Sequence, residues 1–127
     1  DYAHHPTEIK ATLTAAKHLD YKRVIAVFQP FTFSRTALLK DDFIKALSIA
    51  DKVILTPIMG SREINEYGIY SEDLAAGLKD AEVIDGFEKV ADRVIEIAGE
   101  GDLVITMGGG DIYKAAHIIT NRLGDSK

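Results

Sequence analysis

Short apolar runs alternate with amphipathic segments along this chain. Three runs are continuous and rich in β-branched residues, at 24–28, 53–55 and 103–106, and a weaker fourth lies at 81–84. Continuous runs are typical of strands that are covered on both faces, and such strands occur mainly in parallel sheets. The four runs therefore predict a mostly parallel sheet.

Amphipathic helices are predicted between these strands. Apolar residues recur at helical spacing in four segments, roughly 7–19, 34–50, 87–97 and 112–119. Another helix is expected to begin at Ser71, whose hydroxyl can cap a first turn that carries two acids. Gly99 and Gly124 are expected to end the last two helices. This alternation predicts an α/β fold, a Rossmann-like three-layer sandwich, as one domain over residues 1–127.

The composition narrows the classes of partner. No cysteine is present, which excludes a disulfide framework and a thiolate metal site. No apolar run reaches the roughly 18 residues of a membrane span, and the N-terminus does not resemble a signal peptide. The net charge is −5 and the basic residues are scattered. We therefore expect neither a membrane nor a nucleic acid as a partner.

An arginine follows the first predicted strand, at the edge of the sheet where open parallel sheets bind ligands. Thr32 or Ser34 can cap the next helix, which places Arg35 in its first turn. The helix dipole favours anions there, so an arginine at this position hints at an anionic partner such as a carboxylate. The alternative is an exposed Arg35 that pairs with a nearby acid.

Three glycines separate the last predicted strand from the last helix. Gly108, Gly109 and Gly110 would let the backbone approach a ligand, and amides at the helix start can bind an anion. The alternative is a tight turn that requires positive φ. The segment is neither a P-loop nor a complete dinucleotide fingerprint, so the residues alone predict no reaction.

Two further features are a pair of adjacent histidines near the N-terminus and one long irregular stretch. His4 and His5 are adjacent and point in different directions, so local hydrogen bonds before a helix are favoured over a zinc site. The longest irregular stretch, roughly 58–70, has a length that is often functional. Within it, Arg62 and Glu63 are interpreted as a solvated ion pair.

Four segments, in order, resemble signatures of the C-terminal domain of Mur ligases, in the branch that joins L-alanine to UDP-N-acetylmuramate. They are DYAHHPTE at 1–8, FQPFTFSRT at 28–36, SRE at 61–63 and GGGDI at 108–112. Because the first signature begins at residue 1, we expect the chain to be a piece of a longer protein. The resemblance implies that an N-terminal UDP-sugar-binding domain and a central ATP-binding domain precede it.

The resemblance also implies a reaction. Mur ligases use ATP and Mg²⁺ to phosphorylate a carboxylate, and the amino group of the incoming amino acid then attacks the acyl phosphate. The P-loop and the magnesium ligands belong to the central domain. We therefore expect no catalytic residue and no metal ligand in this chain, and no activity from it alone. The setting implied is bacterial, cytoplasmic synthesis of peptidoglycan precursors.

The resemblance assigns roles to five residues. Asp1 matches an aspartate that holds the ribose of ATP, and His5 is assigned to the same ATP site. Tyr2 and His4 match positions between the nucleotide and the amino acid. Arg35 matches the arginine that binds the carboxylate of the amino acid.

The chain also departs from some relatives. Phe31 and Thr32 stand where these relatives have histidine and arginine, so the carboxylate depends more on Arg35. A tripeptide-adding murein-recycling ligase is the alternative within the family, and Tyr2 favours the alanine enzyme because phenylalanine is expected there in the recycling ligase. A non-catalytic module that binds a small ligand at the glycine turn is the alternative from another class.

Overall fold

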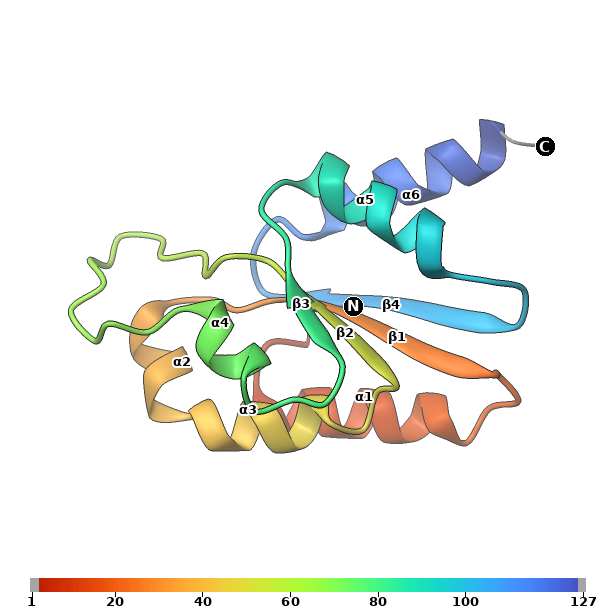
Figure 1. Ribbon diagram of the computed structural model, residues 1–127. Coiled ribbons are helices and arrows are strands. Elements are labelled where there is room, and N and C mark those ends of the chain that lie inside the picture. The colour runs from red at the N-terminus through yellow and green to blue at the C-terminus, as the bar shows by residue number, and fades with distance from the viewer. Residues whose placement is uncertain (1–2, 126–127) are drawn as a thin grey trace.

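The computed structural model describes residues 3–125 and shows a four-stranded sheet between two layers of helices (Figure 1). Helix α6 continues past Gly124, where the sequence predicted its end. The elements are α1 (Pro6–Lys17), β1 (Arg23–Gln29), α2 (Phe33–Leu38), α3 (Lys40–Leu47), β2 (Lys52–Leu55), α4 (Ser71–Ala75), β3 (Ala81–Val83), α5 (Phe87–Ile97), β4 (Asp102–Gly108) and α6 (Tyr113–Asp125). None of the helices in this part of the chain has the length and apolar character that spanning a membrane requires.

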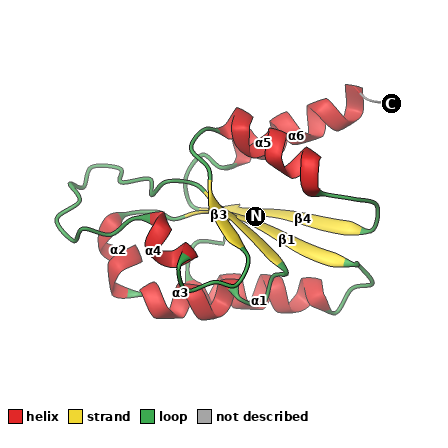
Figure 2. Cartoon of the chain, in the orientation of Figure 1, coloured by secondary structure: helices red, strands yellow, loops and turns green. Residues whose placement is uncertain are grey.

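The strand order is β3-β2-β1-β4, and all three neighbouring pairs are parallel. The chain moves outward from β1 through β2 to β3 with α3 and α4 on the same face as α1, then returns to β4 with α5 and α6 on the other face (Figure 2). Crossovers of one hand require this change of face when the direction reverses. The predicted three-layer sandwich is confirmed, and the direction reverses between β1 and β4, where such sheets bind ligands.

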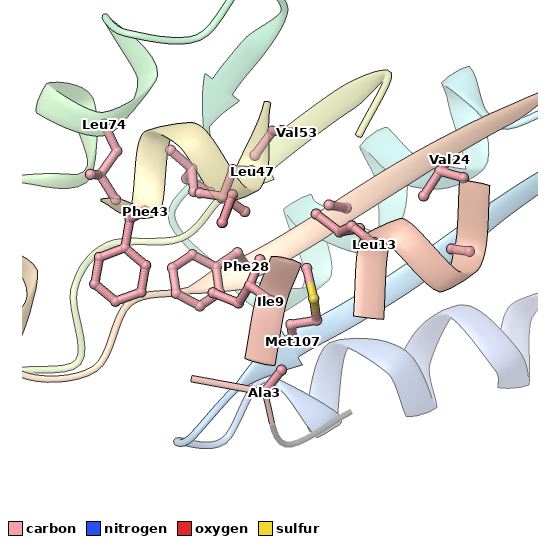
Figure 3. Close-up of a cluster of buried hydrophobic side chains, with 14 residues drawn as sticks. Ala3, Ile9, Leu13, Val24, Phe28, Phe43, Leu47, Val53, Leu74 and Met107 are labelled. Carbon is pink, nitrogen blue, oxygen red and sulfur yellow. The ribbon is translucent and has the colours of Figure 1, made fainter. Parts of the chain in front are cut away.

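Strand β1 lies inside the sheet and is buried on both faces. Val24, Ala26 and Phe28 pack with α1, α3 and α4, whereas Val27 packs with α5 and α6. The ring of Phe28 lies 5.5 Å from the ring of Phe43 in α3 (Figure 3). Burial on both faces explains why the sequence shows a continuous apolar run rather than an alternating one.

The single helix predicted at 34–50 is wrong, because the structure has two helices, α2 and α3, that meet at Leu39. Leu39 has φ −108° and ψ 19°, outside the helical range. Its amide still donates to the carbonyl of Arg35, and its carbonyl accepts from the amide of Phe43. Because these hydrogen bonds and the apolar spacing continue across the break, the periodicity could not reveal it.

The prediction that Ser71 caps the next helix is also wrong. Ser71 is the first residue of α4, and its buried hydroxyl donates to the carbonyl of Thr56 at 2.5 Å. Tyr70 is the N-cap residue, and its amide donates to the carboxylate of Asp73 at 2.8 Å. A carbonyl that is distant in sequence therefore replaces the local amide as the partner of the Ser71 side chain.

One carboxylate joins three elements at the amino edge of the sheet. Asp51, which precedes β2, accepts a hydrogen bond from the amide of Val24 in β1 at 2.8 Å and from Nζ of Lys17 in α1 at 3.0 Å. The bond from the Val24 amide, together with the contact to Lys17, holds the pKa of Asp51 below its ordinary value of 3.8. A lowered pKa means that the charged carboxylate stabilises the folded state.

We expect Asp51→Asn to lower the free energy of unfolding at pH 7 by about 1 kcal/mol, since the contacts are partly exposed. The contribution is complete above the unfolded pKa of roughly 4 and is lost as the pH falls through the lower folded pKa. Urea denaturation at pH 7 and at successively lower pH should therefore show the two proteins converging. Asp20→Asn, at an exposed residue, is the matched control, and a difference between wild type and Asp51→Asn that is constant with pH would contradict the assignment.

Candidate functional site

The loops that follow β1 and β2 lie side by side at the carboxyl edge of the sheet (Figure 1). Phe31 forms a parallel bridge with Met59. The amide of Thr32 donates to the carbonyl of Met59, and the amide of Met59 donates to the carbonyl of Pro30, both at 2.9 Å. These bonds fix the start of the long loop at 58–70 against the segment that leads into α2.

Arg35 lies in the first turn of α2, as predicted. Of the two candidate caps, Thr32 is the one used, and its Oγ1 accepts from the amide of Arg35 at 3.4 Å. Within residues 3–125 the guanidinium of Arg35 has no hydrogen-bonding partner and no ion pair, whereas Arg23, Arg93 and Arg122 are all ion-paired. Arg35 therefore forms no ion pair within the described residues, although its charge acts on the nearby Glu63.

The predicted ion pair between Arg62 and Glu63 is wrong. Glu63 instead binds the start of α2: its carboxylate accepts from the amide of Ser34 at 3.0 Å and from the Ser34 hydroxyl at 2.5 Å. The hydroxyl bond, then the amide bond, holds the pKa of Glu63 below its ordinary value, and the charge of Arg35 adds to this shift. No local pattern could reveal the contact, because it joins two loops across the sheet edge.

Sequence reasoning also missed Gln29, the last residue of β1. Its side chain is 4% exposed, and its Nε2 donates to Oδ1 of Asp111 at 2.9 Å. Its Oε1 is buried without a hydrogen-bonding partner in the described part of the chain. A buried acceptor without a partner is costly, and such groups concentrate at functional sites.

The glycine turn packs closely against this glutamine and against a histidine. A Cβ atom on Gly110 would lie 2.6 Å from Oε1 of Gln29, and one on Gly109 would lie 3.3 Å from Cβ of His4. Gly108 has a φ of 153°. The alternative of a turn that requires a positive φ therefore applies to Gly108, whereas close packing explains the glycines at Gly109 and Gly110. The amides of Gly110 and Asp111 donate no hydrogen bond to any group in residues 3–125, so they remain available to an anion.

A cleft of about 260 Å³ opens beside this turn, lined by Gln29, Thr56, Met59, Asp85, Phe87 and Asp111 among others. It lies at the carboxyl ends of the strands, where ligands of open parallel sheets bind. A larger hollow of about 510 Å³ borders Asp51 and Asp80, at the amino ends. Position rather than volume therefore makes the smaller cleft the better candidate.

The histidines before α1 make the local contacts that were predicted. Nδ1 of His5 accepts from the amide of Thr7 at 3.2 Å, and the amide of His5 donates to Glu8 at 3.2 Å. His4 lies 3.6 Å from the same carboxylate. Asp1 and Tyr2, the other predicted ligand-binding residues of this segment, lie outside the described residues. No group of three or more potential metal ligands occurs within residues 3–125.

A family model described as Mur ligase, glutamate ligase domain, matches residues 1–110, most of the chain. The chain belongs to the Mur ligase family. This Mur ligase domain is 50% identical over 126 residues to the UDP-N-acetylmuramate–L-alanine ligase of Caldicellulosiruptor saccharolyticus, and the match covers 96% of the chain. It is also 50% identical over 118 residues to the ligase of the same name from Lachnospira eligens, with 90% of the chain covered. The chain spans only 28% and 26% of these two relatives.

Solved structures agree with this assignment. The crystal structure of the UDP-N-acetylmuramate–alanine ligase of Thermotoga maritima matches the Mur ligase domain with a TM-score of 0.76 and 26% identity, over 100% of this chain and 26% of that one. A murein peptide ligase from Psychrobacter arcticus shares the fold, with a TM-score of 0.75 and 22% identity, over 98% of this chain and 26% of that one. The predicted family and fold are thus confirmed.

We expect Gly110→Ala to destabilise the Mur ligase domain by about 1–3 kcal/mol, because the new methyl group overlaps the Gln29 amide. The same substitution should cost less in a Gln29→Ala background, where the overlapping atoms are absent. Urea denaturation of the four proteins in this cycle measures the coupling. Gly99→Ala is the control, since its nearest neighbour would be 3.8 Å away. Additive effects in the cycle would refute the close approach.

Proposed function

We propose that this chain is the amino-acid-binding C-terminal domain of an ATP-dependent ligase that joins L-alanine to UDP-N-acetylmuramate. The activity belongs to the whole protein, and the chain spans only 28% and 26% of the length of the two relatives. The observation that carries the proposal is Arg35, whose unpaired guanidinium lies at the carboxyl edge of the sheet in a chain that is 50% identical to ligases of that name. We place the protein in bacterial, cytoplasmic synthesis of peptidoglycan precursors.

The role we assign to this chain is to bind and orient the amino acid. Arg35 holds the carboxylate of L-alanine through two parallel hydrogen bonds, which leaves the amino group free to attack. We assign His4 and Tyr2 to contacts between the nucleotide and the amino acid, as the family resemblance implies. Asp1 and His5 bind ATP, and for His5 only Nε2 is available because Nδ1 accepts from the Thr7 amide.

The glycine turn has a separate part in this proposal. The free amides of Gly110 and Asp111 bind an anionic group of a substrate. ATP supplies the phosphoryl group that activates the carboxylate of UDP-N-acetylmuramate, and Mg²⁺ is held by the rest of the protein. We therefore expect this chain alone to be inactive.

The decisive experiment uses the full-length natural protein. Phosphate release is measured with ATP, Mg²⁺ and UDP-N-acetylmuramate, with either L-alanine or the tripeptide of the recycling enzymes added. We expect release that depends on L-alanine. Release that depends on the tripeptide would assign the protein to the recycling ligases. Release with neither, from a folded protein, would leave the non-catalytic binding module as the better proposal.

Arg35→Ala in the full-length protein should raise the KM for L-alanine by roughly 30-fold or more, because loss of a charged bidentate contact costs about 2 kcal/mol or more. The KM for ATP should stay close to the wild-type value, since the nucleotide does not depend on this side chain. Arg62→Ala is the matched control: Arg62 is also an unpaired arginine at the same edge, but it is exposed, whereas Arg35 is partly buried. An unchanged KM for L-alanine in Arg35→Ala would refute the role of Arg35.

A further inference from the structure

The contact between Glu63 and Ser34 joins the loop after β2 to the first turn of α2. Both carboxylate oxygens are used: one accepts from the Ser34 amide at 3.0 Å, and the other accepts from the Ser34 hydroxyl. Ser34 immediately precedes Arg35. The carboxylate thus reaches the helix from another loop and binds it next to the arginine that we propose holds the amino acid.

Helix α2 depends on contacts of this kind. It has six residues, too few for a stable helix without outside contacts. The exposed Leu38 near its other end is 82% accessible, so that end adds little apolar packing. At its start α2 is held by the Thr32 cap and by Glu63, and at its other end it continues through Leu39 into α3.

The backbone on both sides of the contact is in an unusual conformation. Thr32, which caps α2, has a φ of 66°, and Ser61, two residues before Glu63, has a φ of 58°. All other residues with a positive φ within residues 3–125 are glycines. Each such conformation costs of order 1 kcal/mol and persists only when the surrounding contacts enforce it. The two strained positions are held by the bonds that Thr32 and Glu63 make between the loops.

We propose that Glu63 is a positioning residue for amino-acid binding: through Ser34 it fixes the first turn of α2 so that the Arg35 guanidinium faces the substrate carboxylate. This inference rests on the proposed function of Arg35 and extends it to a residue that does not touch the substrate. The negative charge of Glu63 does not itself help to bind the substrate, because the Glu63 carboxylate and the substrate carboxylate compete for Arg35. The hydrogen bonds of Glu63 are therefore what matters.

This reasoning separates two substitutions. Glu63→Gln keeps an oxygen that accepts from the Ser34 amide and gains an NH₂ group that donates to the Ser34 hydroxyl, so the geometry is retained without the charge. Glu63→Ala removes both bonds. Glu66→Ala is the matched control, since Glu66 is exposed in the same loop and its side chain has no hydrogen bond or ion pair with the described residues.

The experiment measures kcat and the KM for L-alanine, ATP and UDP-N-acetylmuramate in the full-length protein. We expect Glu63→Ala to raise the KM for L-alanine about tenfold, as the loss of two hydrogen bonds to a charged group implies. The KM values for ATP and UDP-N-acetylmuramate should remain within about twofold of wild type, well below the tenfold step that 1.4 kcal/mol represents. Glu63→Gln should restore the KM for L-alanine to within about threefold, because its bonds replace those lost, and Glu66→Ala should match wild type.

Three results would overturn the inference. They are an unchanged KM for L-alanine in Glu63→Ala, an equal rise in all three KM values, and a Glu63→Gln variant as weak as Glu63→Ala. Urea denaturation of each variant identifies a general loss of folding, in which case Glu63→Gln alone decides. If the wild-type protein showed no dependence on L-alanine, the proposed function itself would fail, and the inference with it.

Discussion

Strand β1 and the direction in which the chain leaves it determine most of this structure. β1 pairs with β4 along seven residues and with β2 on its other edge, and both of its faces are covered by helices. The neighbouring strands and helices therefore cover β1 on all sides, and its carboxyl end, at Gln29 and Pro30, leads out into a loop. Because β2 and β4 lie on opposite sides of β1, their loops leave in different directions, and the candidate site lies where they separate.

Polar contacts between these loops give the site its shape. Glu63 binds the start of α2, and Gln29 binds Asp111 beside the glycine turn. The first contact joins residues that are 29 positions apart in the chain, and the second joins residues that are 82 positions apart. In the first, a carboxylate from a loop binds the start of a helix, and in the second, the last side chain of β1 binds the loop that precedes α6. Within residues 3–125 the Arg35 guanidinium and the amides of Gly110 and Asp111 have no hydrogen-bonding partner, and these are the groups that we propose bind a substrate.

The described residues carry two kinds of group that the proposed reaction would use. The described part of the chain offers an unpaired guanidinium and free amides, which suit carboxylate and phosphate groups. It offers no cluster of metal ligands. Asp1 and His5, which we propose bind ATP, belong to the segment that precedes α1 in the sequence. In the proposed function, this domain binds the amino acid, and the rest of the longer protein activates the carboxylate.

The sequence by itself determined the order of the elements, the parallel sheet, the family and the position of Arg35 in a first helical turn. The elements, the sheet and the position of Arg35 follow from local burial and from capping, which leave a periodic or short-range pattern in the chain. The family was indicated separately, by four segments that resemble Mur ligase signatures. Only the tertiary structure decided that Glu63 binds Ser34 rather than pairing with Arg62, that Ser71 binds the Thr56 carbonyl, and that Gln29 packs against Gly110. Each of these contacts depends on which loops the strand order brings together. A side chain that has several chemically equivalent partners finds its actual one only when the sheet has placed them.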